Sequence, residues 1–277
     1  MTSESNGDSS QARPTSSVRW QRLGAVVATD LRDRILTGDL ANEELLPKED
    51  DLRHIYPVSK ASIREALRIL EAEGLITVRR GNQGGSLIRR PTAANVAYAL
   101  ALVLRAGDVK IEHVATALQE TEPVCAALCA RRADRAETVV PQLRALHESG
   151  MRQIDDVAAV VALSRSFHEA MVDHCGNGAL KVVVGALEAI WSTHERTWSR
   201  TSPARLVQLD DRYEALRAHE RILEAIEQGE PAAAHRLAAG HLQVVQSYPT
   251  ADASAGVLPE LVREHLLRAF QIPDGAS

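Results

Sequence analysis

Two histidines in the second half of the chain have the spacing that metal ligands take on paired helices. His219 and His241 are 22 residues apart, and a turn sequence, Gly-Glu-Pro at residues 229–231, falls midway between them. If two antiparallel helices meet at this turn, both imidazoles lie about 15 Å from it and level with each other. Facing imidazoles in a helical bundle can hold Zn²⁺ or Ni²⁺ and leave one position open for water or a ligand. The chain has ten histidines, so coincidental placement is the alternative.

A third histidine and an aromatic stripe lie on other helical segments. His168, in the run SRSFHEAMVDHC, can supply a third nitrogen if its helix packs beside the first two. Trp191, His194 and Trp198 recur at steps of three and four residues, which is typical of a helix face that packs in a core or lines a pocket. The sequence therefore indicates a histidine-lined pocket, and both a metal site and a metal-free polar lining stay open.

A cationic row follows one edge of a helix predicted earlier in the chain. Ser59 is a favourable N-cap for this helix and Gly74 a favourable end. Apolar residues recur between them at helical spacing, at Ile63, Ala66, Leu67 and Leu70. Lys60, Arg64 and Arg68 follow one another at four-residue steps and form a row beside the apolar stripe. Basic side chains in such a row can bind the edges of guanine bases, or phosphates, when the helix lies in the major groove of DNA. A solvated helix face is the simpler alternative.

The residue pattern changes from a helical period to a period of two after Gly74. Leu75, Ile76 and Val78 lead into Arg79 and Arg80, a glycine-rich stretch follows from Gly81 to Gly85, and residues 87–90 are again apolar and then basic. This pattern predicts a β-hairpin with a basic tip. A helix followed by a slim cationic hairpin is the plan of a winged helix-turn-helix, a domain that reads DNA.

The elements around these motifs are predicted to be helices. Residues 26–36 and 49–56 have helical patterns, so three helices precede the hairpin. After Pro91 the apolar periodicity is helical throughout, and we predict an all-α bundle. Its predicted segments are 93–105, 111–133, 137–151, 155–174, 179–200, 204–228 and 231–247, and a further amphipathic segment spans Leu258 to Phe270.

Residues 20 to 90 resemble the N-terminal domain of the GntR family of bacterial transcription regulators. The resemblance rests on the runs LRDRILTGDL, LPKEDDL and VSKASIREALRILEAEGLITVRRG, in this order. It implies that Lys60, Ser62 and Arg64 contact DNA from the recognition helix, and that Arg80 and Gly81 form the tip of the wing. The family usually carries Arg where this chain has Asp50. We therefore do not expect the operator sequences of relatives to apply here.

Residues 92 to about 247 resemble the FCD-type effector domain of the FadR subfamily. The runs TEPVCAALCARRA, SFHEAMVDHCGN and AHERILEAIEQGEPAAAHRLAAGHL carry this resemblance. It implies that His168, His219 and His241 bind one transition-metal ion per subunit. Ser164 stands where metal-binding relatives have Asp, so one carboxylate ligand is missing and we expect looser binding.

The resemblance also implies a carboxylate effector, but the family's usual binding residue for it is absent. Leu118 stands where an Arg is frequent, so a carboxylate needs a different partner. We take Arg165, His194 and Arg196 as candidate effector contacts.

Composition agrees with a two-domain intracellular protein. The 277 residues are 45% hydrophobic with a net charge of −5, and no secretion signal or membrane-spanning run is visible. Between residues 58 and 91, seven basic residues stand against three acidic ones, so the predicted DNA-binding surface is locally cationic. The three cysteines are expected to be reduced, and Cys125 and Cys129 to fill the core.

The predicted parts are a disordered arm (1–17), a winged helix-turn-helix (18–91), an effector-binding and dimerisation bundle (92–250) and a C-terminal linker with a possible helix (251–277).

These features together predict a cytoplasmic, homodimeric transcription regulator, with the character of a repressor. Its partners would be a double-stranded DNA operator and a small carboxylate effector, and no membrane is expected. The alternative is a metal-dependent helical enzyme that the N-terminal module tethers to DNA. Since no general base or nucleophile motif accompanies the histidines, we predict that the protein is not an enzyme.

Overall fold

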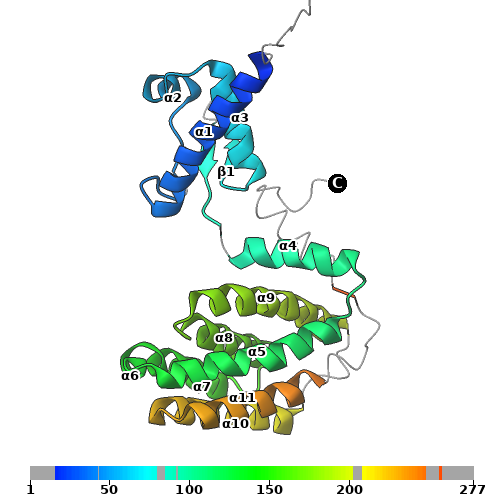
Figure 1. The fold of residues 1–277 in the computed structure, drawn as a ribbon. Helices are drawn as coiled ribbons and strands as arrows, with labels where there is room; N and C mark the ends of the chain where they lie inside the picture. Colours follow the sequence, from blue (N-terminus) through cyan, green and yellow to red (C-terminus); the bar gives the residue numbers. More distant parts are fainter. Residues whose placement is uncertain are drawn as a thin grey trace, which may run out of the picture. The chain divides into compact units, whose positions relative to one another are not determined.

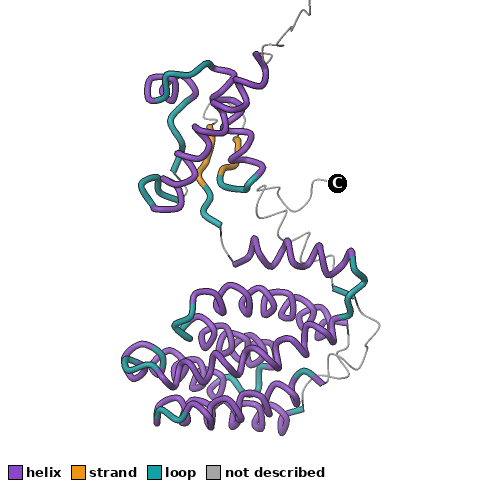
Figure 2. The backbone as a smooth tube through the Cα atoms, in the orientation of Figure 1, coloured by secondary structure: helices purple, strands orange, loops and turns teal. Residues whose placement is uncertain are grey.

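The computed structural model describes residues 16–42, 44–79, 85–91, 93–201, 208–247 and 256–257. Within these ranges the chain is mainly helical, with one two-stranded antiparallel sheet (Figures 1 and 2). This confirms the predicted fold class. The chain divides into two compact units, Met1–Pro91 and Thr92–Ser277. Across the described ranges, no helix combines the length and apolar character that a bilayer crossing requires.

Three helices form the body of the first unit, namely α1 (Ser16–Thr37), α2 (Glu49–Ile55) and α3 (Lys60–Ala72). Helix α3 begins after Ser59, whose hydroxyl accepts a hydrogen bond from the Ser62 amide (3.2 Å). It ends just before Gly74, whose φ of 73° lies in the left-handed region that glycine adopts without strain. The buried side chains of α1 and α3 share one core, which includes Val27, Leu31, Ile35, Ile63, Ala66 and Leu70.

The wing of the first unit is a β-hairpin, as predicted. Strands β1 (Ile76–Arg79) and β2 (Gly85–Ile88) pair antiparallel, with Ile76 opposite Ile88. The Arg90 guanidinium donates to the Ile35 carbonyl (3.0 Å) near the end of α1, where helix carbonyls lack a partner in their own helix. The hairpin is therefore fixed to the helices. The predicted tip residues Arg80 and Gly81 lie outside the described part of the chain.

Helices make up the second unit, and α5 packs against α8, α9, α10 and α11 (Figure 1). The helices are α4 (Ala93–Ala106), α5 (Ile111–Arg131), α6 (Arg135–Thr138), α7 (Val140–Arg152), α8 (Val157–Asp173), α9 (Gly178–Thr201), α10 (Leu209–Gln228) and α11 (Pro231–Val245). The predicted bundle is thus confirmed, but the structure divides the segment predicted at 137–151 into α6 and α7 on either side of Val139.

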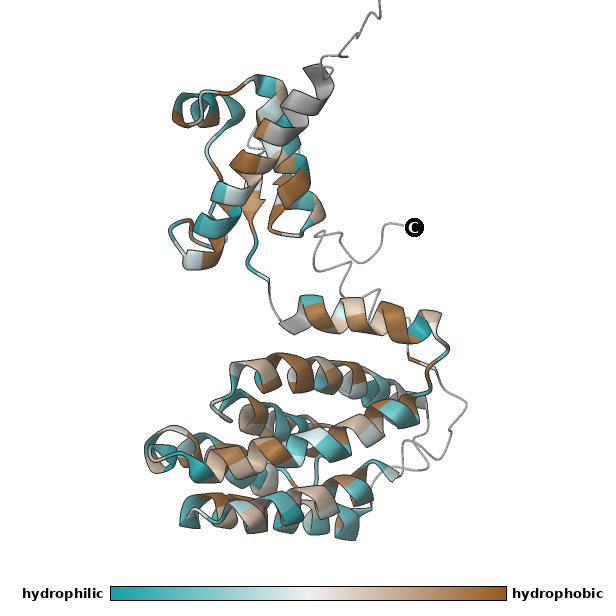
Figure 3. Ribbon diagram, in the orientation of Figure 1, coloured by the Kyte–Doolittle hydropathy of each residue, from teal (hydrophilic) through white to brown (hydrophobic). Residues whose placement is uncertain are grey.

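The core of the second unit is built from small and aliphatic side chains together with Phe167, Met171 and Trp191. Figure 3 shows that hydrophobic residues recur along the helices of this unit. Cys125, Cys129 and Cys175 are buried, unpaired thiols within it. Burial raises the pKa of Cys129 to about 12, which keeps the thiol protonated and unreactive. Near the C-terminus, Arg105 donates to the Val257 carbonyl (3.3 Å). The amphipathic segment predicted at Leu258 to Phe270, like most of the predicted N-terminal arm, lies outside the described residues.

The turn between α10 and α11 controls the register of the two helices that carry the paired histidines. Gly229 ends α10 with a left-handed φ of 70°, and Pro231 occupies the first turn of α11, where its missing N–H costs no helix hydrogen bond. The two helices pack on each other along their length. A short, rigid turn of this kind keeps residues at equal distances from it side by side.

Candidate metal centre and DNA-reading surface

Three histidine side chains from three helices converge inside the second unit. His168 comes from α8, His219 from α10 and His241 from α11. Their Nε2 atoms are 3.0 Å apart for His219 and His241, and 3.3 Å apart for each of the other two pairs. All three residues are buried, and they form the one group of potential metal ligands found in the described ranges. The structure therefore brings together the three residues that the sequence singled out.

Neighbouring side chains fix the orientation of two of these rings. A carboxylate oxygen of Glu122, which is fully buried on α5, lies 2.5 Å from Nδ1 of His168. This contact requires the proton on Nδ1 if Glu122 is ionised, so that Nε2 presents a lone pair to the other histidines. The ring of Phe167 stacks on His219, with centroids 4.3 Å apart and planes within 6° of parallel. Glu122 was not identified from the sequence.

The environment keeps the three imidazoles neutral. Burial lowers the pKa of His219 well below its ordinary value, and the neighbouring His241 lowers it further. Burial, together with His168, also lowers the pKa of His241 to about 3. A metal ligand must be the neutral imidazole, so the cluster is in the state that binds a metal over the whole neutral pH range.

The donor set fits a transition-metal ion. A tetrahedral Zn²⁺ with nitrogen ligands at about 2.05 Å places its ligand atoms about 3.3 Å apart, close to the three separations observed. Without an ion, Nε2 of His168 can only accept when its N–H is on Nδ1, so the three nitrogens depend on one N–H each from His219 and His241. Three buried nitrogens at these distances are therefore better satisfied by a shared cation than by hydrogen bonds among themselves.

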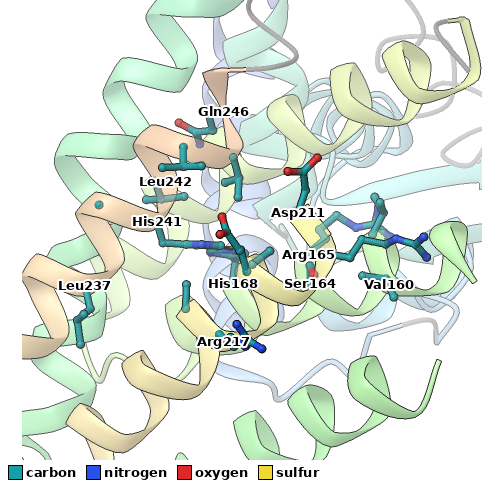
Figure 4. Close-up of a pocket in the computed structure, with 18 of the residues that line it drawn as sticks. Val160, Ser164, Arg165, His168, Asp211, Arg217, Leu237, His241, Leu242 and Gln246 are labelled. Atoms are coloured by element: carbon teal, nitrogen blue, oxygen red, sulfur yellow. Dashed lines mark hydrogen bonds between the residues drawn. The ribbon is translucent and has the colours of Figure 1, made fainter. Parts of the chain in front are cut away.

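A cavity of about 760 Å³ opens beside the histidine cluster (Figure 4). His168 and His241 line it, together with Ser164 and Arg165 from α8 and Asp211 from α10. Ser164 lies one helical turn before His168, the position from which an additional side chain would reach the same centre. The predicted effector contact Arg165 thus lines the pocket.

The other two predicted effector contacts are placed differently. His194 is buried, with its ring 5.7 Å from that of Trp191, and Arg196 donates to the Thr193 hydroxyl (3.1 Å). Neither is among the described residues that line the cavity. The structure therefore does not place His194 and Arg196 in the lining of this cavity, and their assignment as effector contacts stays a prediction.

Two acidic residues of α9 line the cavity and were missed by sequence reasoning. Glu188 and Glu195 share a face of α9 with Trp191, since the three follow at steps of three and four residues. Burial raises the pKa of Glu188 well above its ordinary value, and Glu122 adds to the shift. Burial raises the pKa of Glu195 to about 7, with a contribution from Glu188. The helical spacing was visible in the sequence, but acidic residues at such spacing usually lie on a solvated face.

The predicted DNA-reading row lies on the exposed surface of α3. The side chains of Lys60, Arg64 and Arg68 are 48%, 58% and 72% exposed. Glu49 at the start of α2 approaches two of them, at 3.7 Å from Lys60 and 3.1 Å from Arg64. Asp50 lies 4.0 Å from Lys60. These exposed ion pairs are weak and can exchange for phosphate or base contacts. Arg79 at the end of β1 is also exposed.

Ser62 does not belong to this surface. Its residue is fully buried, and its hydroxyl lies 3.1 Å from that of Ser59. A side chain under the helix cannot touch DNA, so the DNA contact assigned to Ser62 is wrong. Its role is structural, at the N-terminus of α3.

Comparison with known proteins places both units in described families. The model of the gntR family of bacterial regulatory proteins matches residues 23–84, and the model of the FCD domain matches residues 113–244. An uncharacterized HTH-type transcriptional regulator of Mycobacterium tuberculosis is 28% identical over 236 residues, which cover 82% of this chain and 92% of the relative. The HTH-type transcriptional repressor NanR of Citrobacter rodentium is 26% identical over 230 residues, covering 82% and 85% of the two chains.

Among solved structures, Streptococcus agalactiae GntR superposes with a TM-score of 0.62 over 81% of this chain and 99% of its own. At 21% sequence identity this likeness concerns the fold alone. The winged hairpin, the helical bundle and the two family matches lead to the same assignment. The chain belongs to the GntR family of bacterial transcription regulators and carries a C-terminal FCD domain.

Proposed function

We propose that the protein senses a small carboxylate through a metal ion held by His168, His219 and His241. The chain is a ligand-responsive, DNA-binding transcription regulator, as its two domains and its relatives establish. The single observation that carries the proposal is the convergence of three neutral imidazoles at the wall of an effector-sized cavity. The lining of this pocket combines apolar side chains with charged and polar ones that can orient a small molecule.

The residues around the cluster have distinct tasks in this proposal. The three histidines hold the ion, and Glu122 orients His168 through Nδ1. A bound Zn²⁺ or Ni²⁺ would supply a Lewis-acidic position that attracts a carboxylate oxygen. Arg165 is the cationic pocket residue on the same helix as His168, and it would bind the remaining carboxylate oxygen. Ser164 leaves the centre one carboxylate short, so we expect about one ion per subunit, held less firmly than by four ligands.

We further propose that Lys60, Arg64, Arg68 and Arg79 contact operator DNA, and that the protein acts as a cytoplasmic homodimeric repressor. A single winged helix offers a small footprint, so specific binding generally requires two half-sites. Exposed apolar side chains on two adjacent helices support dimerisation through the second unit. They are Val96, Leu102 and Val103 on α4, and Val182 and Val183 on α9.

The alternative of an enzyme tethered to DNA has no support in the comparisons, because the matched families and relatives are transcription regulators. A selection of bound sites from a random DNA pool tests the regulatory proposal. We expect the full-length protein to enrich a two-fold symmetric sequence, and Zn²⁺ to change its affinity for that sequence relative to chelator-treated protein. Enrichment of no sequence, or identical affinity with and without metal, would count against the proposal.

A further inference from the structure

The wall of the cavity formed by α9 has a chemical character that a simple carboxylate effector does not explain. Glu188, Trp191 and Glu195 all line the cavity from one face of this helix. Glu188 and Trp191 are each 5% exposed. Glu188 and the indole therefore lie inside the pocket, and Glu195, which is half-buried, carries a second carboxyl group on the same wall.

The arginines that line the pocket come from other helices than α9. Arg165 is on α8, Arg212, Arg217 and Arg221 are on α10, and Arg236 is on α11. Arg165 pairs with Glu169 (3.6 Å), and Arg212 donates to the Ile154 carbonyl. Within the described ranges, neither Glu188 nor Glu195 forms an ion pair with a lysine or arginine. The charged lining residues of α9 are thus both acids, whereas α10 contributes the acids Asp211, Glu214 and Glu220 as well as arginines.

A buried acid without a cationic partner is costly, and it favours a ligand that supplies the cation. Burial raises the pKa of Glu195 to about 7, Glu188 adds to the shift, and the charges of Arg165 and Arg196 only partly oppose it. A carboxylate effector alone would place a second anion near these carboxyls. A protonated amine would neutralise them, and the face of Trp191 between them is the surface that best attracts an ammonium group.

We propose that the effector carries a protonated amine as well as a carboxylate, and that Glu188, Trp191 and Glu195 bind the amine. The carboxylate of the same molecule would face the histidine cluster and Arg165. The effector class is therefore an amino acid or another amine-bearing acid. The inference rests on the proposed function, because it takes the cavity as the effector site.

Matched pairs of probes test the inference with full-length, Zn²⁺-loaded protein. The members of each pair differ only in an amine or a hydroxyl, and the pairs are L-alanine and L-lactate, L-aspartate and L-malate, L-phenylalanine and L-phenyllactate, and 2-amino-2-deoxygluconate and gluconate. In at least one pair we expect the amine to raise the melting temperature and to bind at least ten-fold more tightly than its hydroxy counterpart. Glu195→Gln should remove that preference, whereas Glu224→Gln, at an exposed site on α10, should keep it.

The outcomes separate this inference from the proposed function. Equal or tighter binding of the hydroxy acids overturns the amine site and leaves the carboxylate pocket intact. A lack of response to every amine, with Zn²⁺ still raising the melting temperature, also overturns the amine site but not the metal centre. A lack of response to Zn²⁺ itself contradicts the proposed function. An amine preference that survives in Glu195→Gln overturns the assignment of that residue.

Discussion

Glu122 determines which nitrogen of His168 faces the other two histidines. Its carboxylate lies 2.5 Å from Nδ1, leaving Nε2 within 3.3 Å of both His219 and His241. A residue that orients a ligand ring in this way changes affinity without touching the ion. The chemistry of the site therefore depends on a buried acid that lies 46 residues from His168 along the chain.

Ser164 is the position at which a single substitution should strengthen metal binding. Ser164→Asp places a carboxylate one helical turn before His168, inside the cavity. We expect zinc affinity to rise at least ten-fold, because the introduced carboxylate would add a negatively charged fourth ligand to the three neutral imidazoles. Competition with a fluorescent zinc chelator measures this change. Ser166→Asp on the same helix, at a residue outside the cavity lining, should leave the affinity unchanged. Equal affinities of the two variants would contradict the placement of Ser164.

Glu195 should make the stability of the metal-free protein depend on pH. Its pKa in the folded protein is about 7, above the ordinary 4.5, so its contribution to stability is present below about pH 4.5 and is lost as the pH rises through about 7. Glu195→Gln cannot ionise and avoids this loss. We compare the two proteins by the difference in melting temperature, Glu195→Gln minus wild type. We expect this difference to increase from pH 5 to pH 8. A difference that stays constant over this range, as expected for the exposed control Glu224→Gln, would contradict the raised pKa of Glu195.

At the scale of elements, local signals in the sequence were sufficient to predict most helices. Ser59, Gly74 and Gly229 act through their own backbone and side-chain chemistry, so the ends of α3 and α10 were predictable. The turn at residues 229–231 also made it predictable that His219 and His241 lie side by side, as their Nε2 atoms do at 3.0 Å. Ser62 was misread because the resemblance outweighed its position one helical turn before the buried Ala66.

The acidic side of the pocket was not predictable in the same way. Whether Glu188 and Glu195 face solvent or a cavity depends on which helices cover α9, and a single sequence does not encode that packing locally. Charged residues are rarely buried, so helical spacing alone favours a solvated face for both.

Helix α3 should read DNA through Arg64. Its side chain is 58% exposed and is held by Glu49 only through a weak surface ion pair. Arg64→Ala should cost about 1–3 kcal/mol of specific binding and reduce the discrimination between operator and random DNA. Gel-shift titrations at two salt concentrations measure both quantities. Arg152→Ala, at an exposed ion-paired arginine of the second unit, is the matched control. If Arg64→Ala binds the operator as tightly as this control does, α3 is not the recognition helix.

At the scale of the whole molecule, the second unit leaves apolar surface for a partner. Val103 on α4 is 69% exposed, and Val183 on α9 is 52% exposed. Val103→Glu should weaken the homodimer at least ten-fold, because a charge would be buried in the interface. Val26→Glu in the first unit changes a valine of similar exposure, 66%, and should leave the dimer intact. Sedimentation velocity at micromolar concentration distinguishes the two. A wild-type protein that sediments as a monomer would contradict the dimer.

The metal content of the protein tests the central claim most directly. After incubation with Zn²⁺ or Ni²⁺ and removal of free ions, elemental analysis should find about one ion per subunit in the wild type. His241→Ala should hold none, because the remaining two nitrogens cannot keep the ion against dialysis. His235→Ala, at an exposed histidine of the same helix, should retain it. A wild type that stays free of metal under these conditions would contradict the account, and the three histidines would then be polar lining of a metal-free effector pocket.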